Sequence, residues 1–493
     1  MNRGIIRYIL GYVAGIEAVL MLFPLLIALI YGETVGFYYL GTAVCAFVLG
    51  MLLKHKKPGN SVFYLKEGCI ITALSWILLS LIGCIPLWLS GEIPHFIDAV
   101  FEVVSGFTTT GASILGDVES LSHCAIMWRS FTHWIGGMGV LVFLLAVIPL
   151  SGGSNINLMR AESPGPSVGK LVPKVKQTAK ILYLIYLGLT ALEFIFLLCG
   201  RMSVFDSLNT AFATAGTGGF GFRNDSFASF SPYLQWVVTI FMILFGVNFN
   251  AYYFILFRNL KKALKMEEVR CYFVIIIIAI AIIFTGILDS CASIGDALTK
   301  AAFQVASVMT TTGFSTVDFN VWSGTCKTVL VLLMFIGGCA GSTSGGIKVS
   351  RFVILFKTMI KELNSYIHPK SIRKIKVEGK PVEHDVVRSI NVYIITFVLI
   401  FAASTFLISL EGHDLVTNFT AVAATINNIG PGLSLVGPAC NFGFFSDFSK
   451  IVLIFDMLAG RLELFPLLIL FHPAVWKDMF AKRDSWGNSP RKV

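Results

Sequence analysis

The chain alternates between long apolar stretches and short polar connections. Six stretches lack Asp, Glu, Lys and Arg and are each near or above the roughly 20 residues that span a bilayer. They are residues 34–53, 68–91, 226–257, 271–288, 328–347 and 389–410. With the shorter apolar runs, the pattern predicts ten spanning helices, at about residues 5–31, 36–53, 69–91, 126–150, 181–200, 232–257, 271–288, 328–357 (interrupted), 389–410 and 451–472. The predicted fold class is an all-α polytopic membrane protein.

Composition and charge agree with this class. Of the 493 residues, 56% are apolar and only 13% are charged, about half the charged share of a typical soluble protein. An ordinary soluble enzyme is therefore excluded. If both termini share one side, 31 of the 38 Lys and Arg residues fall in segments on that side, which the positive-inside rule assigns to the cytoplasm. The net charge of +10 is thus an orientation signal, and we expect no nucleic-acid partner.

Four outward segments share a pattern typical of short helices that dip back into the membrane. Each starts near an Asp and ends 12 to 17 residues later in a glycine turn rich in small residues. The four segments are residues 97–113, 205–220, 295–315 and 413–432. Their Asp residues, which we expect to cap the helices, are Asp98, Asp206, Asp296 and Asp414. The turn glycines lie 107, 95 and 117 residues apart, which indicates a fourfold internal repeat.

The repeats divide the chain into five predicted units. Each repeat consists of a spanning helix, a short helix, a glycine turn and a second spanning helix. The units are two leading helices with a basic inner loop (1–67), repeat 1 (68–159), repeat 2 (160–265), repeat 3 (266–360) and repeat 4 with a cytoplasmic C-terminus (361–493).

The four glycine turns point to a pore for a monovalent cation. Non-helical backbone at membrane depth is tolerated only where it is buried in protein or lines a water-filled cavity. Glycine allows successive carbonyl groups to aim inward, and rings of carbonyl oxygens replace the hydration shell of a cation. Small residues also serve close helix packing, which would account for a single turn. Four copies at matched positions favour the pore.

Six sequence motifs resemble the Trk/Ktr/HKT superfamily of potassium transporters, and most closely the bacterial TrkH-type membrane subunit. They are SGFTTTGAS (105–113), ATAGTGGFG (213–221), VMTTTGFST (308–316), ATINNIGPG (424–432), GGCAGSTSGGIK (337–348) and AGRLELFP (459–466). The resemblance implies K⁺ uptake across the bacterial cytoplasmic membrane by two leading helices and four membrane-pore-membrane repeats around one central pore. It also implies a homodimer and a cytoplasmic nucleotide-binding regulatory ring of the TrkA type. No enzyme activity and no covalently bound cofactor are expected, and K⁺ is the transported ion.

The resemblance further assigns a K⁺ selectivity filter made of backbone oxygens. Its residues would be Thr109, Thr110, Gly111, Gly216, Thr217, Gly218, Thr311, Thr312, Gly313, Asn428, Ile429 and Gly430. In this alignment Gly216 takes the place of Thr109 and Thr311, so the fourfold chemistry is approximate. In related transporters a serine at the first filter glycine accompanies sodium permeation, so Gly111 favours potassium by analogy.

The interrupted eighth helix is a candidate gate. Five glycines in ten residues cannot hold a stable helix in lipid. A phosphate loop is rejected because Ile347 separates the glycine from Lys348. A packing kink is the alternative, whereas the resemblance implies an intramembrane loop, residues 337–347, that obstructs the pore. The gate residues would be Gly337, Gly338, Gly341, Ser342, Thr343, Ser344, Gly345 and Gly346.

Arg461 lies about ten residues into the last predicted span, near the middle of the membrane, where a charge requires a partner or water. Neither Asp456 nor Glu463 shares its helix face, so we expect hydroxyl or carbonyl partners from the gate loop or other repeats. The resemblance implies a pore-lining charge that limits leak, and a structural ion pair is the alternative. Arg129 and His133 are expected to reach the outer membrane surface.

Three classes of function compete. A gated K⁺ pore needs only the filter and the loop. A secondary transporter that couples K⁺ to H⁺ or Na⁺ would need a titratable relay, and the filter sequences supply no carboxylate beyond the capping Asp residues. An intramembrane enzyme would need convergent His, Glu or Cys groups, and the chain has no HExxH motif. The basic segment 348–388 is the best candidate surface for a cytoplasmic partner because of the resemblance, and an orientation signal alone is the alternative.

Overall fold

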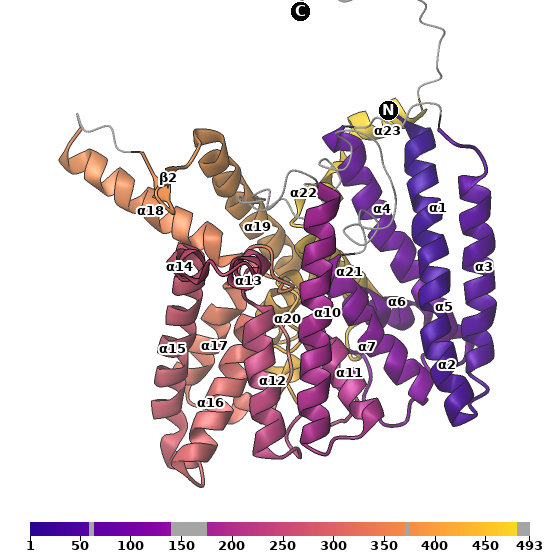
Figure 1. Cartoon of the computed structure of the whole chain (residues 1–493), viewed down its shortest axis with the longest axis horizontal. Helices are drawn as coiled ribbons and strands as arrows, with labels where there is room; N and C mark the ends of the chain where they lie inside the picture. The colour runs from indigo at the N-terminus through magenta and orange to yellow at the C-terminus, as the bar shows by residue number, and fades with distance from the viewer. Residues whose placement is uncertain (59–63, 140–174, 370–373, 481–493) are drawn as a thin grey trace, which may run out of the picture.

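The structure is a computed structural model that describes residues 1–58, 64–139, 175–369 and 374–480. Over these residues it is a bundle of helices with one small antiparallel pair of strands, β1 (Lys376–Val377) and β2 (Lys380–Pro381) (Figure 1). The predicted boundary between repeats 1 and 2, at residues 159 and 160, lies outside the described residues. The predicted fold class, an all-α polytopic membrane protein, is confirmed.

Two leading segments precede the repeats at one side of the bundle (Figure 1). They are α1 (Arg3–Leu20) continued by α2 (Leu22–Tyr31), and α3 (Gly36–Lys54). Glycines bring α1 and α3 into close contact, because a Cβ built on Gly50 would lie 2.8 Å from the carbonyl oxygen of Gly11. Small residues allow this approach between membrane helices.

The four repeats follow one plan, in which a short helix lies between two longer segments. Repeat 1 contains α4 (Leu65–Gly83), α5 (Ile85–Leu89), α6 (Phe96–Phe107) and α7 (His123–Met138). Repeat 2 contains α10 (Val175–Cys199), α11 (Val204–Ala215), α12 (Pro232–Phe245), α13 (Phe249–Leu256) and α14 (Leu260–Lys265). Repeat 3 contains α15 (Glu267–Ile287), η1 (Leu288–Ser290), α16 (Ile294–Met309), η2 (Phe319–Val321), α17 (Gly324–Phe335) and α18 (Val349–Ile367). Repeat 4 contains α19 (His384–Ser409), α20 (Leu415–Ile426), η3 (Ser434–Val436), α21 (Asp447–Arg461), α22 (Phe465–Leu468), η4 (Ile469–Phe471) and α23 (Pro473–Phe480). Two predicted boundaries, after residues 67 and 360, fall inside α4 and α18, so these helices are assigned whole to repeats 1 and 3.

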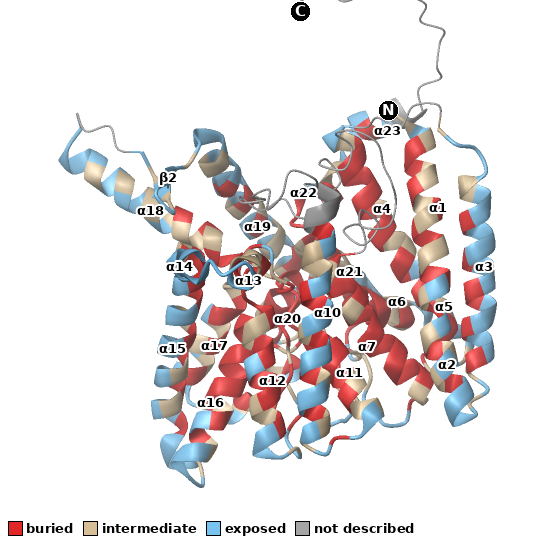
Figure 2. Cartoon of the chain, viewed as in Figure 1, coloured by how far each residue is buried: buried red, intermediate tan, exposed pale blue. Residues whose placement is uncertain are grey.

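The short helices α6, α11, α16 and α20 occupy the interior, and longer helices surround them. Figure 2 shows buried residues concentrated at these central helices and exposed residues along α3 and α15. The exposed side chains on the outer helices are themselves apolar, for example Ile277 on α15 and Phe406 on α19. Apolar residues that face outward on a long apolar helix are suited to lipid, so the molecule has a packed interior inside a lipid-facing shell.

Some of the predicted spans are broken. Among the described residues, six helices are long and apolar enough to cross a membrane, and one further candidate is the pair α12 and α13, which is bent by 92°. A continuous helix over 232–257 is therefore wrong, because the chain turns at Gly246 and Asn248 caps α13. A continuous helix over 451–472 is also wrong. There α21 ends at Arg461, and the backbone of Glu463 and Leu464 is left-handed.

Asp caps only one of the four short helices, which corrects the prediction. Asp414 caps α20 by accepting from the backbone N–H of Thr417. Its hydrogen bonds with the Thr417 hydroxyl and backbone N–H hold the pKa of the Asp414 carboxyl below its ordinary value. Ser203 and Ser293 cap α11 and α16, whose Asp residues lie in the first turn, and α6 has no side-chain cap. A carboxylate in the first turn still stabilises the helix, because it interacts with the positive end of the helix dipole.

A buried ion pair joins α6 to α7. The Arg129 side chain is 3% exposed and lies 2.8 Å from Glu102, which is fully buried. Glu102 also accepts from the hydroxyl of Ser113 and the backbone N–H of Ile114, at 2.9 and 3.0 Å. The guanidinium donates to the carbonyl of Gly221 in repeat 2. The expectation that Arg129 reaches the membrane surface is therefore wrong, because a carboxylate on the neighbouring helix holds it inside.

We expect Gly50→Leu to lower the thermal unfolding midpoint of the purified protein in detergent. The added side chain has no room against α1, and overpacking costs about 1–3 kcal/mol. Gly41→Leu is the matched control on the same helix, since a Cβ at Gly41 meets nothing within 4 Å. Equal effects of the two substitutions would contradict the close contact between α1 and α3.

We expect Glu102→Gln to destabilise the protein by about 3–5 kcal/mol, because it leaves the Arg129 charge buried without its counter-ion. Lys300→Met is the control, since it removes the partly exposed pair with Asp296, and such surface pairs contribute about 0–1 kcal/mol. Unfolding transitions in detergent measure both changes. A loss for Glu102→Gln no larger than for Lys300→Met would show that the buried pair does not stabilise the fold.

Candidate functional site

Each short helix ends in the same unusual turn. The second residue after each helix has a positive φ, which places its backbone in the left-handed region. These residues are Thr109, Thr217, Thr311 and Asn428, with φ of 55°, 52°, 58° and 55°. The left-handed region costs an L residue about 1–2 kcal/mol, and β-branched threonine is a clear outlier there. Such strain persists only where the surroundings impose it, which marks these turns as a candidate functional site.

The hydrogen bonds of the four turns are also equivalent. In each turn the residue after the left-handed position donates its backbone N–H to the carbonyl five residues earlier. The four bonds are Thr110 to Ser105, Gly218 to Ala213, Thr312 to Ser307 and Ile429 to Ala424, at 2.9, 2.9, 2.8 and 2.9 Å. This bond is the one that closes a Schellman motif at a helix end. The turns therefore share one backbone conformation.

This equivalence corrects the predicted alignment of repeat 2. Thr217, and not Gly216, corresponds to Thr109 and Thr311. Gly216 is the right-handed C-cap of α11, in the place of Thr108 and Thr310. The turn glycine of repeat 2 is accordingly Gly219, which has a φ of 76°, and not Gly218. The sequence Gly-Thr-Gly-Gly offers two glycines for one position, so aligning by glycine alone chose the wrong one. The other three turns stay as predicted.

The four turns close into a ring. A Cβ built on each turn glycine would collide with, or closely approach, a backbone carbonyl oxygen of the next repeat. The approaches are Gly111 to Gly218 at 2.0 Å, Gly219 to Thr312 at 1.8 Å, Gly313 to Ile429 at 2.1 Å and Gly430 to Thr110 at 2.9 Å. The last contact returns from repeat 4 to repeat 1. Glycine is required at these places because the neighbouring carbonyl occupies the position of a side chain.

A hollow of about 140 Å³ opens on one side of this ring. All four turn glycines line it, and so does Arg129.

Polar side chains of the turns also form hydrogen bonds with one another. The hydroxyls of Thr108 and Thr110 are 2.8 Å apart, and the amide of Asn428 donates to the Thr110 hydroxyl at 2.9 Å. The side chains of the turns are thus used to join the repeats.

The predicted gate residues lie against the opposite side of the ring. Residues 336–348 connect α17 to α18 without a helix, and Ile336 and Ile347 form a single parallel bridge. The backbone N–H of Gly345 donates to the hydroxyl of Thr311 at 2.7 Å. A Cβ on Gly345 would lie 2.6 Å from the carbonyl oxygen of Asn427. The loop therefore contacts the turns of repeats 3 and 4 directly.

A buried carboxylate on α15 holds the start of this loop. Glu268 accepts from the backbone N–H groups of Ala340 and Ser350, at 2.6 and 3.1 Å, and from the side-chain amide of Asn248 at 3.3 Å. The break between α12 and α13 also receives the loop, because Cys339 donates to the carbonyl of Gly246 at 2.9 Å. Glu268 was not predicted, since its partners lie 20 to 82 residues away in sequence.

Two cations satisfy the loop carbonyls. Arg461 donates to the carbonyl of Thr343 at 2.9 Å and to those of Gly137, at 2.8 Å, and Gly136 in repeat 1. Lys348 donates to the carbonyls of Ser344 and Gly345. The partners of Arg461 are carbonyl groups of the loop and of another repeat, as its position predicted. Lys348 was missed because the sequence placed it at the start of the inward segment.

The two acidic residues near Arg461 have other partners. Asp456 accepts from the hydroxyl of Ser404 at 2.7 Å. Glu463 forms a buried ion pair with Arg351 of α18, whose guanidinium also lies 4.0 Å from the centre of the Tyr393 ring. The segment between α21 and α22 is thereby tied to α18, the helix that follows the loop.

Comparisons with known proteins agree over nearly the whole chain. A family model described as "TrkH: Cation transport protein" matches residues 38–482. The "Trk system potassium uptake protein TrkH" of Salmonella typhimurium is 35% identical over 491 residues, which cover 97% of this chain and 100% of that protein. The "Trk system potassium uptake protein TrkG" of Escherichia coli K12 is 34% identical over 490 residues, covering 96% of this chain and 99% of that one.

A solved structure has the same fold. The "Crystal Structure of the Potassium Transporter TrkH from Vibrio parahaemolyticus" matches with a TM-score of 0.87 and 32% sequence identity, and the match covers 97% of this chain and 100% of that chain. The family model covers well over half of the chain, and the relatives exceed 30% identity across their full length. The chain therefore belongs to the TrkH family of cation transport proteins.

Proposed function

We propose that the chain takes up K⁺ across the bacterial cytoplasmic membrane through a selective pore. The observation that carries this proposal is the closed ring of four glycine turns, one from each repeat. A ring of backbone oxygens can replace the water around a monovalent cation. The names of the relatives, which are potassium uptake proteins, support K⁺ as the transported ion.

The proposed filter follows the corrected alignment. Its twelve residues are Thr109, Thr110, Gly111, Thr217, Gly218, Gly219, Thr311, Thr312, Gly313, Asn428, Ile429 and Gly430. K⁺ enters from the hollow, which we place on the outer side, and exchanges its water for backbone oxygens as it passes into the ring. No covalent chemistry is needed. Glu102, a buried carboxylate that binds the lining residue Ser113, is engaged by Arg129, which favours a pore over a proton-coupled relay.

The loop at residues 337–347 is the proposed gate. It lies against the ring, and its contacts with Thr311, Arg461 and Lys348 hold it there. Arg461 bridges the loop to repeat 1, so its release would free the loop to move. The fixed positive charge of Arg461 beside the pathway also disfavours cations while the loop is in place.

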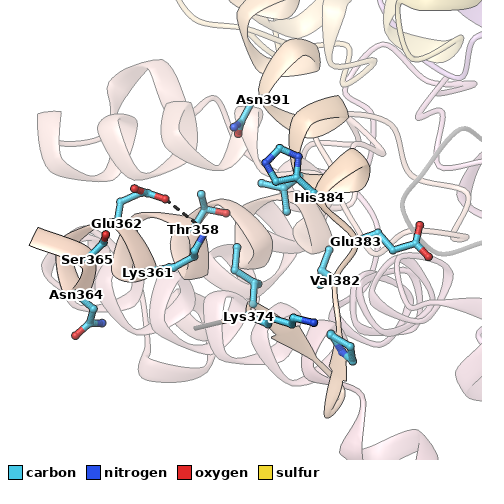
Figure 3. Close-up of a pocket in the computed structure, with 13 residues that line it drawn as sticks. Thr358, Lys361, Glu362, Asn364, Ser365, Lys374, Val382, Glu383, His384 and Asn391 are labelled. Atoms are coloured by element: carbon cyan, nitrogen blue, oxygen red, sulfur yellow. Dashed lines mark ion pairs between the residues drawn. The ribbon is translucent and has the colours of Figure 1, made fainter. Parts of the chain in front are cut away.

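A cytoplasmic regulatory ring of the TrkA type is the proposed partner, and two copies of the chain form a homodimer with one pore each. Both termini then face the cytoplasm. The start of α1 and helix α23 lie at one end of the bundle, and α18 extends outward at that end (Figure 1). A cleft of about 660 Å³ lies there between α18, the strand pair and α19, with Lys361 and His384 among its lining (Figure 3). Because α18 directly follows the loop, a partner bound to this segment could move the gate.

We expect Gly111→Ser to raise the Na⁺ flux relative to K⁺ by about tenfold, equivalent to about 1.4 kcal/mol. The new Cβ would lie 2.0 Å from the carbonyl oxygen of Gly218, so the ring must widen. Flux into liposomes under opposed K⁺ and Na⁺ gradients measures the ratio. Gly41→Ser, on α3 with nothing within 4 Å of an added Cβ, is the control and should keep the flux ratio. An unchanged ratio for Gly111→Ser would remove Gly111 from the filter.

We expect Arg461→Ala to increase K⁺ leak through the closed protein by about tenfold or more. Hydrogen bonds to a charged group contribute about 1.5–3 kcal/mol each, and this change removes the bridge between the loop and repeat 1. Arg7→Ala is the control, since Arg7 lies on α1 and its hydrogen bond to the carbonyl of Lys56 is exposed. Flux is measured in liposomes with and without a pH gradient. A requirement for a proton or sodium gradient in the unmodified protein would instead support coupled transport.

A further inference from the structure

His133 on α7 is fully buried between the turns of repeats 1 and 2, although its sequence position predicted exposure at the outer surface. Its Nδ1 lies 2.8 Å from the carbonyl oxygen of Gly106, and its Nε2 lies 3.2 Å from the backbone N–H of Phe220. A carbonyl can only accept and an N–H can only donate. The imidazole is therefore neutral, with its proton on Nδ1, and it links the backbones of two repeats.

The imidazole also occupies the place of a filter side chain. A Cβ built on Gly218 would lie 2.2 Å from both Cγ and Nδ1 of His133. A Cβ on Gly216 would lie 2.2 Å from the His133 carbonyl oxygen. The residues equivalent to Gly218 in the other turns carry side chains; they are Thr110, Thr312 and Ile429. The turn of repeat 2 thus lacks a side chain at the point where the histidine ring sits.

The contact between repeats 1 and 2 is also exceptional on the side of α7, which carries His133. The second helix of every repeat starts after a capping serine, at Ser122, Ser231, Ser323 and Ser446. The residue eleven positions after each serine is buried in all four, and these residues are His133, Met242, Met334 and Met457. One repeat therefore has histidine in place of methionine, and the turn packed against it has glycine in place of a larger residue.

We propose that His133 is a positioning residue for cation selectivity, which supplies from α7 the packing and hydrogen bonding that the filter turn of repeat 2 does not supply itself. The inference rests on the proposed function of the turns as a K⁺ filter. The two hydrogen bonds of His133 and its contact with Gly218 fix the separation of the turns of repeats 1 and 2. That separation sets the width of the ring on one of its four sides.

An exchange of side chains across this contact tests the proposal. Gly218→Thr alone should reduce K⁺ flux at least tenfold, because the imidazole of His133 occupies the space of the new side chain. His133→Met alone should leave a gap and lower the K⁺ over Na⁺ flux ratio by about tenfold. The double variant, with His133→Met and Gly218→Thr, gives this boundary the residues found in the other repeats. It should recover both the flux and the ratio to within about threefold of the unmodified protein.

The measurements use the full-length protein in liposomes, after gel filtration and thermal unfolding confirm that each variant is folded. Met334→Ala is the matched control, which changes the equivalent position in repeat 3. Combined with Gly218→Thr, it should not restore the K⁺ flux that Gly218→Thr removes. If the double variant has no higher K⁺ flux than Gly218→Thr alone, the proposal is overturned. If His133→Met does not fold, an unchanged ratio in His133→Asn, which can keep the bond to Gly106, overturns it. Unmodified protein that does not discriminate K⁺ from Na⁺ would instead refute the proposed filter.

Discussion

The contact between four glycine turns is the constraint on which the rest of the structure depends. At each turn a carbonyl group of one repeat takes the space of a side chain in the repeat before it, so the ring closes only if all four turns keep the same conformation. Three threonines and one asparagine hold a left-handed backbone that they disfavour. The surrounding helices must stabilise this arrangement, and the buried short helices inside an apolar shell are suited to that task.

The second spanning helices of repeats 2, 3 and 4 are broken, and this is the second constraint on the fold. A broken helix leaves carbonyl and N–H groups without partners, which is costly where water is absent. The loop after α17 meets this demand with buried charges: Glu268 receives its N–H groups, and Lys348 and Arg461 donate to its carbonyls. The unpaired backbone of this loop is therefore enough to explain these charges. They also tie the loop to three different repeats.

Two substitutions at matched positions of the second helices break the fourfold pattern. His133 replaces a methionine beside the turn of repeat 2. Arg461 lies fifteen residues after its capping serine, where the other repeats have Gly137, Gly246 and Gly338. A repeat of four units builds the ring, but one residue in one unit is enough to place a charge or an imidazole on one side of it. Specialised polar groups beside the ring thus arise without a change in the fold.

Local sequence by itself determined the membrane class, the four turns, the glycine-rich loop and the need of Arg461 for buried polar partners, because each depends on residues close together in the chain. Only the tertiary structure decided the alignment of the Gly-Thr-Gly-Gly turn, since the backbone conformation and the neighbouring carbonyl distinguish its glycines. Arg129 and His133 were placed wrongly because their partners, Glu102 and Gly106, lie 27 residues away on another helix. A local pattern predicts that a polar group needs a partner, but packing between helices decides which partner it receives.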